Sequence, residues 1–114
     1  MQNPREIGST GIQVSPVALG CWPIAGMTSL DVNHADSLAT LRTAFELGIN
    51  FYDTAYCYGA NGESEKLIAE ALGPQRDQVV IATKGTITKC SSRHDSTNSS
   101  SSVKVREDTV VEVL

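Results

Sequence analysis

The chain has 114 residues, of which 40% are hydrophobic and 19% are charged, as expected for a single soluble domain that is slightly poor in charge. Its 9 basic and 13 acidic residues give a formal net charge of −4. Because no basic cluster provides a surface for phosphate groups, we expect neither nucleic acid nor a membrane as a partner.

The amino terminus and the cysteines bear on the cellular compartment. Residues 1–6 are polar and no apolar run follows them, so we expect no signal peptide and no transmembrane span. The three cysteines, Cys21, Cys57 and Cys90, form no C-x-x-C pair and are odd in number. A disulfide framework is therefore not expected, and the prediction is a cytoplasmic protein with reduced thiols.

The first elements are short. A turn-rich cluster at 8–11 separates two short segments, which predicts a hairpin over residues 5–14. Residues 17–19 form an apolar run that ends at Gly20, which we interpret as the first strand of a parallel sheet. Residues 21–26 would then be the loop at the carboxyl end of that strand.

Helical and strand patterns alternate in the next part of the chain. Apolar spacing of i, i+3, i+4 and i+7 predicts a helix over 35–47, and a second helix is expected from Glu63 or Ser64 to residue 72. Strands are expected at 49–52 and 79–82. This order indicates βαβ units with parallel strands. A Rossmann sheet begins in the same way, but the first strand lacks a following G-x-G-x-x-G, and periodicity alone leaves barrel and open sheet undecided.

One group of residues decides between these folds. The segment Asn-Phe-Tyr-Asp-Thr-Ala-Tyr-Cys-Tyr-Gly at 50–59, followed by Gly-Glu-Ser-Glu at 62–65 and Val-Val-Ile-Ala-Thr-Lys at 79–84, closely resembles the aldo-keto reductases. The resemblance covers about residues 5–84. It implies an α/β fold in the form of an incomplete (β/α)8 TIM barrel, with the hairpin, the first three parallel strands and two helices. A closed barrel typically needs about 250 residues.

The resemblance also implies a chemistry. Transfer of a hydride to a carbonyl carbon leaves negative charge on the oxygen, and a general acid must protonate that oxygen. Tyrosine is a weak acid, with an unperturbed pKa of about 10, and an ammonium nearby favours its phenolate form. The implied roles are proton donor for Tyr58, activating cation for Lys84 and anchor of that lysine for Asp53.

The same resemblance suggests cofactor and substrate contacts. Gly20, Cys21, Trp22 and Asp53 would lie near the nicotinamide end of NADPH, with NADH as the alternative cofactor. Trp22 and Tyr58 would line the pocket for a small carbonyl or sugar substrate. No cluster of His, Cys, Asp or Glu has metal-ligand spacing, so no metal is expected. The oligomeric state is not predicted.

The chain departs from the family pattern in its second part. The family's catalytic His belongs to a fourth strand that we do not find, and neither His34 nor His94 has its context. Between residues 91 and 102, 7 of 12 positions are serine, so we interpret 85–114 as a non-family tail that is disordered at 88–102. The preferred explanation is a truncated or frame-disrupted gene product, and the alternative is a low-complexity insertion.

These departures limit the expected function. We expect the intact protein to be an NADPH-dependent oxidoreductase, and this chain alone to be inactive, marginally stable or prone to aggregate, with the edges of its first and third strands open. A non-catalytic, cofactor-binding regulatory subunit of the same fold is one alternative. An inert fragment is the other.

Overall fold

A computed structural model describes residues 3–27, 31–85 and 111–113. Its first element is a hairpin in which β1 (Arg5–Glu6) pairs antiparallel with β2 (Gln13–Val14). Asn50 links this hairpin to the main sheet, since its side chain accepts a hydrogen bond from the Ser15 amide at 2.6 Å and donates one to the Gln13 carbonyl at 3.2 Å. Because Asn50 directly precedes a strand, the hairpin lies at the amino end of the parallel sheet.

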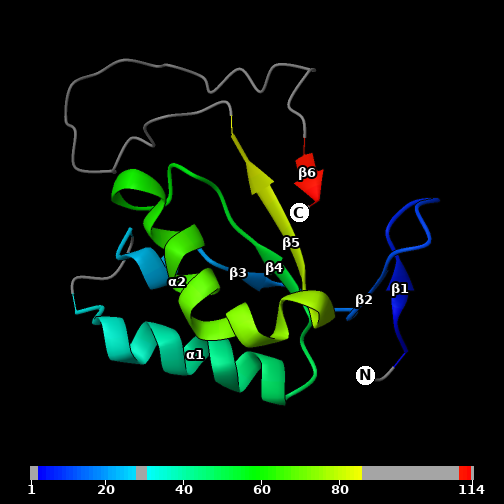
Figure 1. Ribbon diagram of the computed structural model, residues 1–114, viewed down its shortest axis with the longest axis horizontal. Coiled ribbons are helices and arrows are strands. Elements are labelled where there is room, and N and C mark those ends of the chain that lie inside the picture. The colour runs from blue at the N-terminus through cyan, green and yellow to red at the C-terminus, as the bar shows by residue number, and fades with distance from the viewer. Residues whose placement is uncertain (1–2, 28–30, 86–110, 114) are drawn as a thin grey trace.

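The main sheet has four strands in the order β3-β4-β5-β6 (Figure 1). The strands β3 (Leu19–Gly20), β4 (Phe51–Asp53) and β5 (Val80–Lys84) are parallel neighbours. The crossovers between them contain α1 (His34–Glu46) and α2 (Glu63–Leu72). Short 3-10 turns, η1 (Pro23–Ala25), η2 (Ala60–Gly62) and η3 (Gly73–Gln78), complete the connections. The predicted hairpin, three parallel strands and two helices are thus confirmed.

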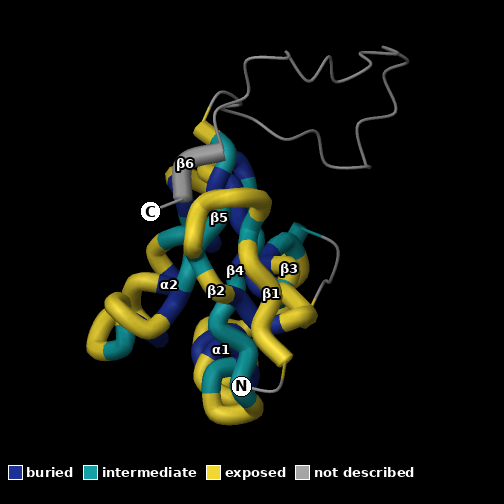
Figure 2. The backbone as a smooth tube through the Cα atoms, turned by 90° about the vertical axis from the view of Figure 1, so that its right-hand side faces the viewer, coloured by how far each residue is buried: buried dark blue, intermediate teal, exposed yellow. Residues whose placement is uncertain are grey.

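The two helices pack on one face of the sheet, and the core lies between them and the strands. Figure 2 shows the buried side of each helix turned towards the strands, whereas the hairpin is largely exposed. Leu41 of α1, Tyr52 of β4 and Ile68 of α2 lie at the centre of this core, each at most 2% exposed. Burying such large apolar side chains is the main source of stability of the described fold.

Strand alternation sends neighbouring residues to opposite faces of the sheet. Tyr52 belongs to the core, and Leu19 and Ile81, its register partners, pack against that core. The next residue of β4, Asp53, is in register with Gly20 and with Ala82. These residues therefore lie on the face opposite the helices, which in a closed barrel is the inner face.

The edge of the third parallel strand, β5, is paired, which differs from the sequence-based prediction of an open edge. That edge was expected to be open, but β6 (Val111–Val113) pairs with it antiparallel, in a register that joins Val113 to Ala82 and Val111 to Lys84. The alternating valines of β6 favour a strand. The free edge of β5 provides the amide and carbonyl groups with which such a strand can pair. The end of the predicted tail therefore belongs to the sheet. The segment predicted to be disordered, 88–102, lies outside the described residues.

Candidate active site

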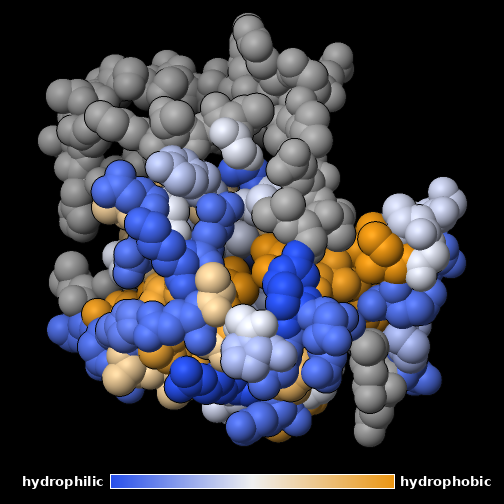
Figure 3. Space-filling view, in the orientation of Figure 1, coloured by the Kyte–Doolittle hydropathy of each residue, from blue (hydrophilic) through white to orange (hydrophobic). Residues whose placement is uncertain are grey.

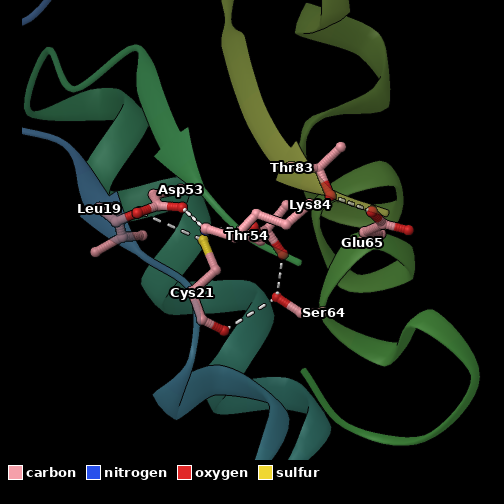
Figure 4. Close-up of polar contacts among 8 residues, drawn as sticks. All are labelled: Leu19, Cys21, Asp53, Thr54, Ser64, Glu65, Thr83 and Lys84. Carbon is pink, nitrogen blue, oxygen red and sulfur yellow. Dashed lines mark hydrogen bonds and ion pairs between the residues drawn. The ribbon is translucent and has the colours of Figure 1, made fainter. Parts of the chain in front are cut away.

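Two charged side chains meet where two neighbouring parallel strands end. Asp53 is the last residue of β4 and Lys84 is the last residue of β5. The Lys84 ammonium donates a hydrogen bond to the Asp53 carboxylate and a second one, 3.0 Å long, to the Thr54 carbonyl (Figure 4). The side chain of Lys84 is 34% exposed and that of Asp53 is 50% exposed, so the pair is accessible from the inner face.

The loop after β4 brings an aromatic pair to the same place. Lys84 Nζ lies 5.4 Å from the centroid of the Tyr58 ring, within the range of a cation–π interaction. The Trp22 ring, from the loop after β3, meets Tyr58 edge to face, with 4.9 Å between ring centroids and an interplanar angle of 85°. Four of the predicted residues, distant in sequence, thus form one cluster.

The family of the chain follows from comparison with known proteins. The sequence model of the Aldo/keto reductase family matches residues 16–111. The chain belongs to this family. The match continues past Lys84, the residue at which we expected the resemblance to stop.

Individual relatives match over about the same part of this aldo-keto reductase chain. It is 40% identical over 81 residues to the aldo-keto reductase YhdN of Bacillus subtilis, covering 69% of this chain and 24% of the relative. It is 41% identical over 83 residues to a putative voltage-gated potassium channel subunit beta of Schizosaccharomyces pombe, covering 70% and 23%. The chain therefore spans about a quarter of the length of the curated relatives it matches.

A solved structure agrees with the predicted fold. The crystal structure of a thermostable aldo-keto reductase in complex with the inhibitor epalrestat superimposes with a TM-score of 0.62 and 32% identity, over 72% of this chain and 30% of that one. The incomplete TIM barrel predicted for the chain is thereby confirmed.

The environment of Lys84 in this aldo-keto reductase chain favours the charged amine. Burial alone would lower the pKa of Lys84, but the hydrogen bond to Asp53, the negative charge of Asp53 and interactions with Tyr58 outweigh it, and the pKa is raised above its ordinary value. An ammonium thus stays beside the phenol ring throughout the neutral pH range.

Of the residues predicted for the cofactor, Gly20 and Trp22 are accessible, whereas Cys21 is not. Gly20 is exposed, and Trp22 is half-buried. Cys21 has no exposed surface, its amide donates to the Asp53 carbonyl at 2.8 Å and its carbonyl accepts from the Ser64 hydroxyl at 3.0 Å. The Cys21 thiol therefore cannot touch a ligand, and its backbone supports the loop that carries Trp22.

A second layer of residues behind the cluster was not predicted. Thr54 donates its hydroxyl to Ser64 at 2.8 Å, and Thr83 donates its hydroxyl to Glu65. Both acceptors stand at the start of α2, so they connect that helix to the ends of β4 and β5. The signal was in the sequence, since Ser64 and Glu65 contributed to the family resemblance, but spacing alone gave them no role.

The other residues considered in the sequence include two histidines and a cysteine. His34 pairs with Glu70 across the exposed side of α1 and α2, at 3.0 Å, and His94 lies outside the described residues. Cys57 is buried, 5% exposed, and the expectation of reduced thiols stays a prediction. Within residues 3–27, 31–85 and 111–113, no group of three or more His, Cys, Asp or Glu could hold a metal ion, and no helix is long and apolar enough to cross a membrane.

Proposed function

We propose that the chain supplies the proton-donating part of an NADPH-dependent oxidoreductase that reduces aldehydes, ketones or sugars. The observation that carries this proposal is the contact of the Lys84 ammonium with Asp53 at the carboxyl ends of two parallel strands, with the Tyr58 ring 5.4 Å from the same nitrogen. Active sites of (β/α)8 barrels lie at these carboxyl ends.

In this proposal each residue has a separate task. The Tyr58 hydroxyl gives its proton to the carbonyl oxygen of the substrate as negative charge develops there. The Lys84 ammonium stabilises the phenolate that remains, and Asp53 holds the ammonium in place. Trp22, packed edge to face on Tyr58, forms a wall of the substrate pocket.

The residues present fit one end of a nicotinamide cofactor. When bound, the reduced cofactor supplies the hydride to the carbonyl carbon. On the face that carries Asp53 and Lys84, β3 presents the exposed Gly20, and an added Cβ there would have no atom within 4 Å. Gly20, Asp53 and Trp22 would therefore hold the nicotinamide end of the cofactor. Cys21, which has no exposed surface, would not touch the cofactor and would only support the loop that carries Trp22.

The test of this proposal is a chimera, because we expect the isolated chain to be inactive. Residues 5–84 replace the matching segment of the aldo-keto reductase YhdN, and NADPH oxidation is measured with a panel of small aldehydes, ketones and sugars. We expect turnover in the chimera. Tyr58→Phe should lower turnover by about 10²- to 10⁴-fold, the usual contribution of a general acid, and should leave NADPH binding nearly unchanged. Lys84→Met should be similarly damaging.

Tyr56→Phe is the matched control for this experiment. Tyr56 lies two residues before Tyr58 and is 41% exposed, so loss of its hydroxyl should not affect turnover. Near-normal turnover of the Tyr58→Phe chimera would show that the proton donor is wrongly assigned.

A second candidate function is a non-catalytic, cofactor-binding regulatory subunit. It is favoured by the 41% identity to the putative potassium channel subunit beta. A folded chimera that binds NADPH but oxidises none of it with any carbonyl in the panel would support this alternative over the enzyme.

A further inference from the structure

Ser64 contacts three separate segments of the site. It is the second residue of α2 and has no exposed surface. Its amide donates to the Tyr58 carbonyl at 3.1 Å, its hydroxyl donates to the Cys21 carbonyl at 3.0 Å, and the same hydroxyl accepts from Thr54 at 2.8 Å. Figure 4 shows the Ser64 hydroxyl bonded to both Cys21 and Thr54, below the Lys84–Asp53 pair in this view.

Each partner of Ser64 is adjacent to, or part of, the proposed machinery. Tyr58 is the proposed proton donor. Cys21 directly precedes Trp22, which packs on the Tyr58 ring. Thr54 directly follows Asp53, and its carbonyl accepts a hydrogen bond from Lys84 at 3.0 Å. One buried side chain thus joins the loop after β3, the end of β4 and the loop that carries the tyrosine.

An ordinary helix cap does not explain these contacts. The N-cap position of α2 is Gly62, and the Ser64 hydroxyl bonds to groups outside α2 rather than to an amide of the first turn, as a capping serine would. A hydroxyl that donates once and accepts once has a fixed orientation, so it also fixes the distance between its two partners.

We infer that Ser64 is a positioning residue that sets the Trp22 ring against Tyr58 and both against Lys84. The importance of this arrangement for carbonyl reduction rests on the proposed function, but the arrangement itself does not. Removal of the hydroxyl leaves the Cys21 carbonyl and the Thr54 hydroxyl without this buried partner, which favours opening of the loop that carries Trp22.

The test uses residues 1–114 and the fluorescence of Trp22, the only tryptophan of the sequence. Ser64→Ala should raise the acrylamide quenching constant of Trp22 by about twofold or more, because loss of one buried hydrogen bond raises the open population of a loop several-fold. Thr54→Val removes the other hydroxyl of the pair and keeps the side-chain shape, so it should change quenching in the same direction.

Tyr52→Phe is the matched control for lost stability. Tyr52 is also fully buried, and its hydroxyl donates to the Ile49 carbonyl at 3.0 Å, at the opposite end of β4. This variant should lower the urea midpoint like Ser64→Ala but leave Trp22 quenching unchanged. Equal quenching in the two variants would overturn the inference. If Ser64→Ala does not fold, unchanged quenching in Thr54→Val would overturn it instead.

The readout separates this inference from the proposed function. Increased Trp22 quenching in Ser64→Ala supports the positioning role even if the YhdN chimera fails to oxidise NADPH, a result that would count against the enzyme alone. If the chimera is active, Ser64→Ala should lower its kcat more than it raises its KM, and Ser64→Thr, which keeps the hydroxyl, should recover part of the loss.

Discussion

Three ionisable residues of the described part of the chain, Cys21, Tyr52 and Lys84, place its pH sensitivity on the alkaline side. Burial, and then the charge of Asp53, raises the pKa of the Cys21 thiol from 9.0 to about 12, against a smaller opposing effect of Lys84. The pKa of Lys84 is raised as well. A pKa raised on folding contributes stability that is complete below the unfolded pKa and is lost as the pH rises towards the folded one.

The predicted consequence is a urea midpoint that begins to fall above about pH 9, where an unfolded cysteine starts to ionise. Cys21→Ala should show a weaker fall, since Lys84 and Tyr52, whose pKa burial raises from 10.0 to about 12, still contribute. Iodoacetamide near pH 8 should label Cys21 only after denaturation, as followed by mass spectrometry of the peptide. Rapid labelling of the folded chain would contradict the burial of this thiol.

Gly59 is required by the path of the loop that carries Tyr58. Its φ is +82°, and an added Cβ would lie 2.6 Å from the Cβ of Glu63 and 3.1 Å from that of Ala25. Gly59→Ala should therefore cost more than about 1 kcal/mol in the free energy of unfolding. Gly73→Ala is the control, because no atom lies within 4 Å of a Cβ there and its φ is −49°. Equal urea midpoints for the two variants would contradict the close approach at Gly59.

The first crossover helix, α1, depends on its amino-terminal cap. Asn33 is the N-cap residue, and its side chain accepts a hydrogen bond from the Asp36 amide at 2.9 Å. Asn33→Ala should cost about 1 kcal/mol of stability, the usual value for a lost cap. Asn33→Ser keeps an uncharged acceptor and should be nearly neutral, whereas Asn33→Asp would place a second carboxylate against that of Asp36, which accepts a hydrogen bond from the Asn33 amide group. The measurement is the urea midpoint of Asn33→Ala and Asn33→Ser, and a loss of equal size in Asn33→Ser would exclude the cap as the cause.

The elements that could be predicted are those with a strong local pattern. Both crossover helices carry apolar residues at helical spacing and end near a glycine, so their limits agree with the structure to within about two residues. Asp53, Tyr58 and Lys84 were selected through the family resemblance, and the structure places them close together. The hydrogen bonds of Ser64 and the pairing of β6 could not be found in this way, because both join segments whose approach depends on tertiary packing.

Among the described residues, helices cover one face of the sheet and leave the other face uncovered. Helices pack on the side of Tyr52 and Ile81, whereas Phe51, Val80 and Ala82 lie on the other face by alternation and are only partly buried. In Figure 3, hydrophobic residues gather between the helices and the hairpin. We therefore expect the chain to self-associate and to bind hydrophobic dyes, as exposed apolar patches do.

Two adjacent residues of β5 test this difference between faces. Val80→Lys places a charge on the uncovered face and should reduce self-association, measured by light scattering, with little loss of secondary structure. Ile81→Lys places the same charge against the core, where burial without a partner costs several kcal/mol, and should unfold the chain. Similar effects of the two substitutions on the circular dichroism spectrum would contradict the assignment of faces.

The antiparallel pairing of β6 occupies the edge of β5 and prevents another strand from pairing there. Each strand edge holds one row of amide and carbonyl groups, and on β5 that row is engaged from Ala82 to Lys84. A further parallel strand, such as a barrel needs beside β5, would have to displace β6 before it could pair. The strand β6 and the next parallel strand of a barrel thus compete for the same edge of β5. The proposed chimera ends its substituted segment at residue 84 and therefore lacks β6, so no strand has to be displaced.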